Sequence, residues 1–147
     1  MCYLREATSE DRDLLFEWAN DPVVRMNSFH SDPISYEEHK NWFNRIMNDE
    51  NSLQFIMMEE DKSIGQIRLT ICDDEATIGY SIGIQYRGKG YGHIILELIA
   101  DEIKNSYPEI RTLNAKVKPD NIASNALFEK AGYEKDYISY SYRLFDV

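Results

Sequence analysis

Basic residues, cysteines and long hydrophobic runs are all scarce in this sequence. Its 16 lysines and arginines are outnumbered by 26 aspartates and glutamates, which leaves a formal net charge of −10. Nucleic-acid binding needs a basic surface, so this balance argues against DNA or RNA as a partner. No apolar run approaches the length of a membrane span, and the first residues do not resemble a signal peptide. These absences predict a cytoplasmic protein without a membrane or nucleic-acid partner.

The two cysteines, Cys2 and Cys72, have no spacing typical of a disulfide or a metal site. We therefore expect free thiols and no metal. The 147 residues suffice for one hydrophobic core and are too few for two ordinary ones. With 43% hydrophobic residues and no repeat or linker, the sequence predicts a single folded domain over residues 1–147.

Hydrophobic periodicity predicts a mixed α/β architecture. Helices are expected from Thr8 or Ser9 to about Asn20, from Ser35 with Trp42, Phe43, Ile46 and Met47 facing inward, after Gly92, and from Asn121 to a C-terminal cap at Gly132. Strands are expected over residues 3–7, 53–58, 64–72, 76–84 and 113–117, with a last strand region over residues 133–145.

Three glycines at alternate positions, Gly88, Gly90 and Gly92, come directly before an amphipathic helix. Glycines let the backbone turn tightly and let a ligand approach the main chain. The first N–H groups of the helix are unpaired and lie at the positive end of its dipole, and Arg87 and Lys89 add charge. The segment therefore predicts an anion site, most naturally for a phosphate or pyrophosphate. It matches neither a Walker loop nor a Rossmann fingerprint.

The flanks of this loop resemble the GCN5-related N-acetyltransferases (GNAT family). Gln85, Gly88 and Gly90 match the family signature Gln/Arg-x-x-Gly-x-Gly/Ala. The segment from Asn121 to Tyr133 resembles the family's N-x-x-S-x-x-x-Y-x-K-x-G-F/Y helix. The resemblance covers nearly the whole chain. It implies the GNAT fold, an α/β protein with a mostly antiparallel twisted sheet of six to seven strands, splayed between the fourth and fifth, and about four flanking helices.

The resemblance implies an acetyl-CoA-dependent N-acetyltransferase, with acetyl-CoA as co-substrate and no metal. The loop would hold the pyrophosphate through its backbone N–H groups. Ile82 and Ile84 would bond the pantetheine arm with their backbone groups, from a strand that bulges in this family and to which Gly79 and Gly83 are suited. The implied cofactor-binding residues are Ile82, Ile84, Arg87, Gly88, Lys89, Gly90, Tyr91, Gly92, Asn121, Asn125, Phe128 and Lys130.

Phe128 stands where many family members have a tyrosine that protonates the departing thiolate. Phenylalanine has no proton to give, so water or another tyrosine, such as Tyr133, Tyr137 or Tyr140, is needed if an acid acts at all. The general base is equally open. Glu75 and Thr77 share one face of a strand, and the family often has a glutamate at the position of Thr77. Glu75 acting through a water is therefore the candidate base.

The acceptor site is expected against the first two helices. The segments 20–30 and 34–43 resemble acetyltransferases of sialic-acid-like sugar pathways that act on the amine of a UDP-linked amino sugar. That resemblance implies that His39 and Thr70 approach the nucleotide or sugar, and that Arg25, His30 and Arg68 are candidates for its diphosphate. A protein N-terminal or ribosomal-protein acetyltransferase and a non-catalytic acyl-CoA-binding module remain alternatives. A monomer and a homodimer are both open.

Overall fold

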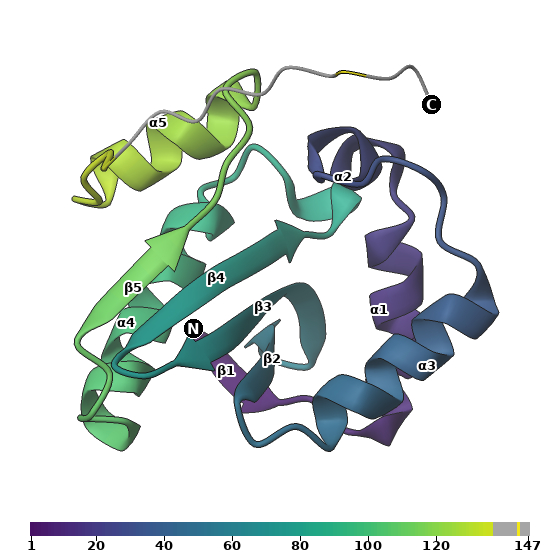
Figure 1. The fold of residues 1–147 in the computed structure, drawn as a ribbon, viewed down its shortest axis with the longest axis horizontal. Helices are drawn as coiled ribbons and strands as arrows, with labels where there is room; N and C mark the ends of the chain where they lie inside the picture. Colours follow the sequence, from purple (N-terminus) through teal and green to yellow (C-terminus); the bar gives the residue numbers. More distant parts are fainter. Residues whose placement is uncertain (137–143, 145–147) are drawn as a thin grey trace.

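The computed structural model describes residues 1–136 and residue 144. Five strands form one sheet in the order β1-β2-β3-β4-β5, which lies at the centre of the molecule (Figure 1). The strands are β1 (Cys2–Glu6), β2 (Ser52–Glu59), β3 (Lys62–Cys72), β4 (Glu75–Ile82) and β5 (Thr112–Ala115). The first four pair antiparallel, and β5 joins β4 in parallel. The last predicted strand, over 133–145, falls mainly outside the described residues.

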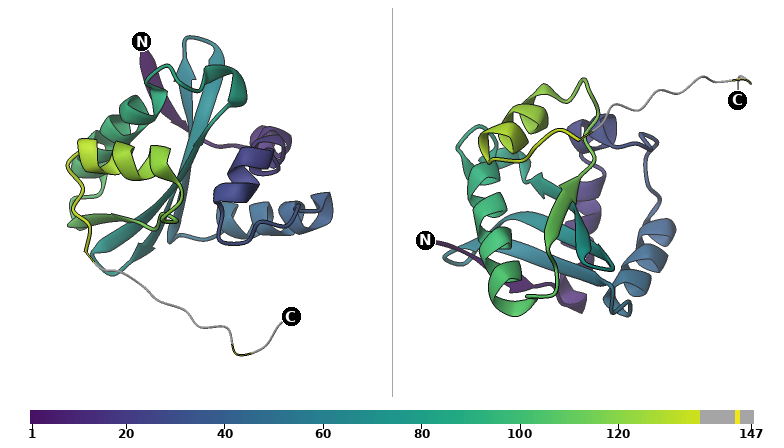
Figure 2. Two further views of the ribbon diagram at one scale, coloured as in Figure 1. Left: turned by 90° about the horizontal axis from the view of Figure 1, so that it is seen from above. Right: turned by 60° about the vertical axis from the view of Figure 1, so that its left-hand side comes forward.

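Helices cover both faces of the sheet (Figure 2). On one face lie α1 (Arg12–Ala19), α2 (Pro22–Asn27) and α3 (Tyr36–Met47), and on the other lie α4 (Tyr91–Ser106) and α5 (Ile122–Lys130). Two 3₁₀ turns, Ser9–Asp11 before α1 and Ile84–Tyr86 before α4, complete the described elements. None of the helices in these residues is long and apolar enough to cross a bilayer.

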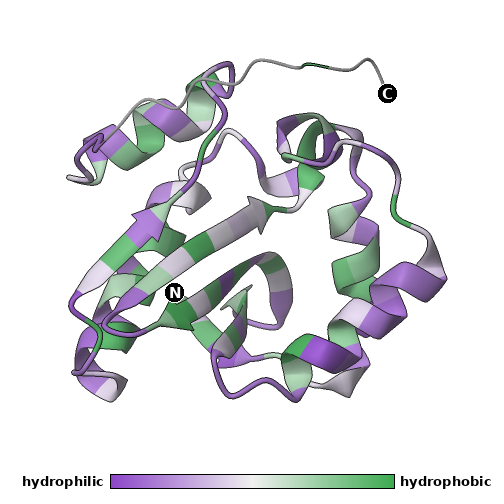
Figure 3. Cartoon of the chain, viewed as in Figure 1, coloured by the Kyte–Doolittle hydropathy of each residue, from purple (hydrophilic) through white to green (hydrophobic). Residues whose placement is uncertain are grey.

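Strand β2 is buried on both of its faces. Phe55 and Met57 belong to the core cluster under α4, whereas Ile56 and Met58 belong to the cluster under α1 and α3. Successive side chains of a strand point to opposite faces, so an apolar strand serves two cores at once. Figure 3 shows the matching hydropathy, with green segments along the strands and a largely purple outer side on α3.

Two predictions about the first helices need correction. Asp21 and Pro22 end α1, but they also begin α2, because Asp21 accepts from the N–H groups of Val23 and Val24 and proline needs no partner at the first helical position. The segment over residues 20–30, in which the sequence predicts no helix beyond Asn20, is therefore partly helical. In α3 the buried residues are His39, Phe43 and Ile46, while Met47 is exposed. His39, rather than the predicted Met47, therefore belongs to the inward face of α3.

The splay between β4 and β5 is present. Their pairing runs only from Glu75 and Thr112 to Ile78 and Ala115, where β5 ends and β4 continues to Ile82. The second half of β4 thus has one edge without a strand partner among the described residues. The bulge that the family resemblance implied is absent from β4, because its register with β3 runs without a shift. The register shift in this sheet lies between β2 and β3, at Met57 and Met58.

The junction of β1 and α1 generates a stability prediction. The Arg5 guanidinium donates to both carboxylate oxygens of the buried Asp11, at 2.7 and 2.8 Å, and the Thr8 amide donates to one of them. These hydrogen bonds, that from Arg5 first, lower the pKa of Asp11 from its ordinary 3.8. Because the folded pKa is the lower one, the stabilisation is present above about pH 4 and is lost as the pH falls through the folded pKa.

Replacing Asp11 by alanine is expected to lower the free energy of unfolding at neutral pH by about 2 to 3 kcal/mol, since it strands a guanidinium and a helix-capping amide. Urea unfolding between pH 5 and 3 measures this free energy. The difference in free energy of unfolding between wild type and variant should shrink as the pH falls. Glu10→Ala, an exposed acid in the same turn, is the control and should change stability by less than about 0.5 kcal/mol. A gap that stays constant with pH contradicts the ion pair.

Candidate active site

The glycine turn at the N-terminus of α4 is open and uncapped among the described residues. Gly88 and Gly90 have φ of 75° and 88°, a left-handed conformation that glycine adopts without strain. A Cβ at either would meet nothing within 4 Å, so the space above the turn is free among the described atoms. No side chain caps the helix at Gly90, which leaves the amides of its first turn pointing outward. Exposed Lys89 lies between the two glycines.

The third glycine has a different function. A Cβ at Gly92 would lie 2.9 Å from Cδ2 of Leu127 on α5, so this glycine lets α4 and α5 pack closely. The side chain of Tyr91 has a structural role too, since its hydroxyl donates to the carboxylate of Glu59 at 2.8 Å. The backbone of Tyr91 and Gly92 still contributes free amides to the first turn of α4. These amides, together with Gly88 and Gly90, fit a diphosphate group.

The open edge of β4 leads away from this turn. Gly83 donates to the carbonyl of Ile64, so Gly65 and Ile82 form a pair without mutual hydrogen bonds. The N–H and C=O groups of Ile82, and of Tyr80 two residues earlier, therefore face away from β3 into the splay. An extended ligand held at the α4 turn can reach this row of backbone groups. Ile84 lies in the 3₁₀ turn rather than in the strand and is largely exposed.

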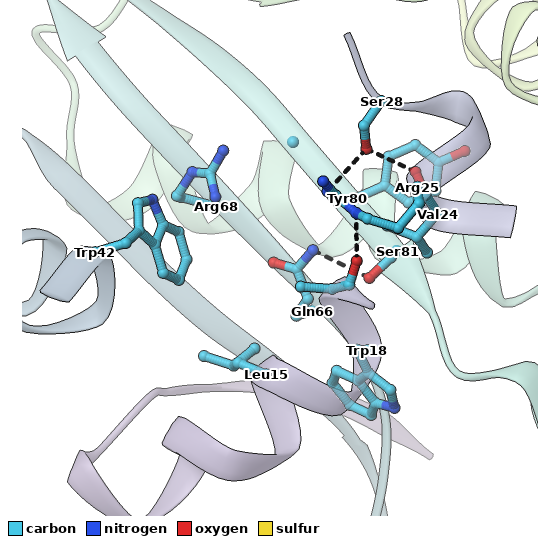
Figure 4. Close-up of a pocket in the computed structure, with 12 residues that line it drawn as sticks. Leu15, Trp18, Val24, Arg25, Ser28, Trp42, Gln66, Arg68, Tyr80 and Ser81 are labelled. Carbon is cyan, nitrogen blue, oxygen red and sulfur yellow. Dashed lines mark hydrogen bonds between the residues drawn. The ribbon is translucent and has the colours of Figure 1, made fainter. Parts of the chain in front are cut away.

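A pocket of about 180 Å³ lies on the face of β4 that points toward α1, α2 and α3 (Figure 4). Polar side chains from β3 and β4 form its floor: Nε2 of Gln66 donates to the hydroxyl of Ser81 at 3.1 Å. The complete lining is Leu15, Trp18, Ala19, Val24, Arg25, Ser28, Trp42, Gln66, Arg68, Gly79, Tyr80 and Ser81.

Arg68 is the most unusual residue of this pocket. Its guanidinium carbon lies 5.1 Å from the centroid of the Trp42 ring, a cation–π contact. Desolvation lowers the pKa of Arg68, although a guanidinium stays charged at any ordinary pH. Gly79 lies beside it, and a Cβ there would be in ordinary van der Waals contact with Nη2, at 3.4 Å. Among the described residues no hydrogen bond or ion pair is formed by its side chain, and Figure 4 accordingly draws none. A half-buried cation of this kind suits an anionic ligand group.

A family model described as an acetyltransferase (GNAT) domain matches residues 2–134. The chain belongs to the GNAT acetyltransferase family. The predicted fold class is thereby confirmed, although the described residues form five strands rather than six to seven and five α-helices rather than about four. At the level of the family, an acetyl-CoA-dependent N-acetyltransferase and acetyl-CoA as its co-substrate are confirmed as well. Membership favours an enzyme over the non-catalytic binding module.

Several named proteins are similar to this chain. The uncharacterized N-acetyltransferase p20 of Bacillus licheniformis is 30% identical and matches 98% of this chain and 88% of p20. The acetyltransferase PseH of Campylobacter jejuni is 26% identical, over 85% of this chain and 78% of PseH. An uncharacterized protein of Methanocaldococcus jannaschii is 27% identical over 90% of this chain, which spans only 28% of that protein's length.

A solved structure shares the fold. The spermidine N-acetyltransferase of Vibrio cholerae, solved with CoA and spermine, gives a TM-score of 0.82 at 18% identity, covering 92% of this chain and 82% of that one.

One predicted cofactor residue of this GNAT domain is occupied by other contacts. Nε of Arg87 donates to the carbonyl of Ile82 at 3.0 Å, and its Nη2 lies 3.1 Å from the Asp21 carboxylate. Burial works to raise the pKa of Asp21, but hydrogen bonds from Arg87 and the α2 amides outweigh it and lower that pKa. Arg87 therefore ties the glycine turn to the start of α2, and its charge is already paired.

The predicted residues of α5 also have structural partners. Asn121 caps α5 by accepting from the Ser124 amide, and Asn125 donates to the carbonyls of Lys118 and Asn121, each at 2.9 Å. Phe128 is buried between two tyrosine rings. Lys130 is exposed in the last turn of the helix. A contact of any of them with CoA stays a prediction, and the capping of Asn121 is compatible with it.

The structure brings Arg25 and Arg68 together in the pocket but not the other predicted acceptor residues. His39 is 2% exposed, and its Nε2 donates to the carbonyl of Arg12, so it is a core residue that cannot touch an acceptor. Burial lowers its pKa, which keeps the ring neutral. His30 and Thr70 are exposed outside the lining.

Arg25 is in the pocket but is engaged there. Its guanidinium donates to the carbonyls of Ala19 and His30 and to the hydroxyl of Ser28, which fixes the chain after α2. Arg68, without such partners among the described residues, is therefore the better candidate for a ligand contact.

The predicted base is badly placed. Glu75 is exposed at the start of β4, and Ser81 is six residues further along, about 20 Å away at 3.3 Å per residue. Neither Glu75 nor Thr77 lines the pocket. Glu75 and Thr77 share one face of β4 with Ser81 but lie nearer the other end of the strand, and the sequence analysis did not single out Gln66 or Ser81. Alternation along β4 was the available signal, since Ser81 has the same parity as Glu75 and Thr77.

The glycine turn generates a binding prediction. Replacing Gly90 by valine should raise the dissociation constant of CoA at least about tenfold, because a β-branched residue strains the positive φ and its side chain enters the anion space. Calorimetric titration with CoA measures the change. Gly132→Val, which strains a similar φ of 92° at the end of α5, is the control for lost stability alone. Equal affinities of Gly90→Val and wild type would remove the turn from the CoA site.

Proposed function

We propose that this GNAT domain transfers the acetyl group of acetyl-CoA to the amine of a nucleotide-linked amino sugar. The observation that carries the proposal is the half-buried guanidinium of Arg68 in the pocket beside β4. Bound acetyl-CoA supplies an activated acyl thioester. The amides at the start of α4, with Gly88 and Gly90, would hold its diphosphate, and the backbone of Tyr80 and Ile82 would face its arm.

The charge of the pocket favours an acceptor with an anionic part. Within the described chain, the charged residues that line it are both arginines, Arg25 and Arg68. A polyamine or an aminoglycoside carries several positive charges, which two arginines in a low-dielectric pocket would repel. A nucleotide sugar carries a diphosphate, which guanidinium groups bind well. The net charge of −10 is therefore a property of the remaining surface and not of this pocket.

The size and lining of the pocket agree with a sugar. Its volume of about 180 Å³ is small beside the roughly 300 to 1,000 Å³ of pockets that enclose a whole ligand. It suits one ring, with the rest of the acceptor outside. Trp18 and Trp42 offer apolar ring surface, whereas Gln66 and Ser81 offer hydrogen bonds to hydroxyl groups. This mixture of aromatic and polar groups is typical of a specific small-molecule site.

The resemblance of the first helices supports the same class of acceptor. The acetyltransferase PseH of Campylobacter jejuni also matches most of this chain. The segments 20–30 and 34–43 resemble acetyltransferases that act on UDP-linked amino sugars. The lining residues from α1, α2 and α3 come from the same part of the chain, so the resemblance and the pocket concern one region.

Chemistry at the pocket requires an unprotonated amine more than a strong base. No carboxylate lines the pocket in the described part of the chain. Ser81 is the end of a hydrogen-bonded chain through Gln66 to Gln54, whose side-chain amides lie 2.9 Å apart. Such a chain of hydrogen bonds can orient an amine although none of its members is a strong base. Proximity and orientation of amine and thioester can supply roughly 7 to 11 kcal/mol of the barrier.

A panel of amines tests the proposed acceptor. Release of CoA thiol would be measured with a UDP-linked amino sugar, spermine, an aminoglycoside and a peptide with a free N-terminus. We expect the highest kcat/KM with the nucleotide sugar, and a nucleotide without the amine should inhibit competitively. Preference for the peptide or the polyamine would overturn the proposal and leave the family assignment intact.

Replacing Arg68 by methionine tests the residue that carries the proposal. Loss of a charge-assisted contact worth about 1.5 to 3 kcal/mol should raise the KM of the nucleotide sugar about 10- to 100-fold. The KM of acetyl-CoA should change less than about twofold, because the loop at α4 is intact. Arg45→Met, which removes the same charge from the exposed face of α3, is the matched control. A rise in the KM of acetyl-CoA alone would contradict the assignment of the pocket.

A further inference from the structure

Tyr80 is a half-buried phenol at the point where β4 separates from β5. Its hydroxyl oxygen lies 2.9 Å from that of Ser124 on α5, and either group can donate. Its ring meets the edge of Phe128 with centroids 5.8 Å apart. Both contacts cross from the strand to the helix that follows the splay, so the phenol stands between the two elements that border the open edge of β4.

The position of Tyr80 along β4 matches the reacting end of the ligand. The turn at Gly88 and Gly90 holds a diphosphate, and the backbone row of Ile82 and Tyr80 leads away from it along the open edge of the strand. Followed from the turn back toward the start of β4, Tyr80 is the last residue with an open edge, because Ile78 already pairs with Ala115 of β5. The chain places a phenol here and a phenylalanine at 128, where the family motif usually has tyrosine.

We propose that Tyr80 donates the proton that the sulfur of CoA takes up as it leaves, and that Ser124 holds the phenol in position. The proposal rests on acetyl transfer from acetyl-CoA and is independent of the acceptor class.

The proton and electron balance of the step is complete. The amine nitrogen forms a bond to the acyl carbon, and the carbon–sulfur bond breaks with its electron pair on sulfur. Sulfur takes the proton of the Tyr80 hydroxyl, and the amine nitrogen loses one proton to water. The Tyr80 phenolate then recovers a proton from water through the hydroxyl of Ser124. No oxidant, metal or further reactant is needed.

The environment of Tyr80 keeps its proton in place until it is needed. Burial raises the pKa of the phenol, and the hydrogen bond with Ser124 opposes this only in part. The group is thus fully protonated at neutral pH. A CoA thiolate is a fair leaving group, with a thiol pKa of about 8.5, so the contribution belongs at the low end of the range for general acids.

The thiol of bound CoA gives a test without turnover. Ultraviolet titration of the thiolate in the CoA complex should give a thiol pKa about one unit higher in Tyr80→Phe than in wild type, since a donor to sulfur is lost. Calorimetry would first show that both bind CoA. Identical thiol titrations in the two complexes overturn the role of Tyr80. Failure of wild type to bind CoA overturns the cofactor site and this proposal together.

Kinetics with any amine that the wild-type protein acetylates provide the second test. Tyr80→Phe should lower kcat about 10- to 100-fold and leave both KM values within about twofold. Tyr3→Phe, which removes an exposed phenol on β1, is the matched control and should act like wild type. Wild-type kcat in Tyr80→Phe contradicts the proposal.

Rescue separates a proton donor from a packing residue. Adding Phe128→Tyr to Tyr80→Phe returns one hydroxyl to the same ring pair at constant volume and should restore at least tenfold of the lost kcat. Ser124→Ala should reduce kcat less than Tyr80→Phe does, because it disturbs the position of the donor and not the donor itself. A double variant that is as slow as Tyr80→Phe, with its CoA affinity intact, would count against a proton donor at this position.

Discussion

The open edge of β4 is the constraint on which the rest of the site depends. Backbone N–H and C=O groups inside a protein need partners, and a strand usually obtains them from two neighbours. Because β5 ends at Ala115 while β4 continues to Ile82, Tyr80 and Ile82 lack a strand on one side within the described part of the chain. An extended ligand that added itself to this edge would complete the sheet. The glycine turn that follows β4 and one 3₁₀ turn would then hold the anionic end of the same ligand.

Alternation along β4 separates the two substrates. Ile78, Tyr80 and Ile82 belong to or pack against the core under α4 and α5, whereas Gly79 and Ser81 face the pocket under α1 to α3. In the proposed arrangement, one strand would present its edge to the thioester and one face to the acceptor. A shift of one residue in the pairing of β3 and β4 would exchange these faces. The proposed arrangement therefore depends on the unbroken register between β3 and β4.

The sequence was informative where local chemistry decides the structure. The glycine turn, the start of α5 at Asn121 and the positions of the five described strands along the chain follow from short-range rules, and they were predicted. Side-chain roles that depend on distant partners were not. Arg87 looked like a phosphate ligand, but Asp21, 66 positions earlier, pairs with it. His39 looked polar, yet it fits the inward stripe of α3, and only the packing of Phe16 and Trp42 around it reveals a core residue.

Arg87 links the two halves of the site. It joins the carbonyl of Ile82, on the open edge of β4, to Asp21, which caps the helix that contributes Val24 and Arg25 to the pocket. A ligand that takes the Ile82 carbonyl as a partner competes with Arg87 for it. If Arg87 moved away from that carbonyl, its contact with Asp21 would change as well, and the Asp21 carboxylate also accepts from the first amides of α2. The same few contacts thus connect the edge where acetyl-CoA is proposed to lie with the wall of the acceptor pocket.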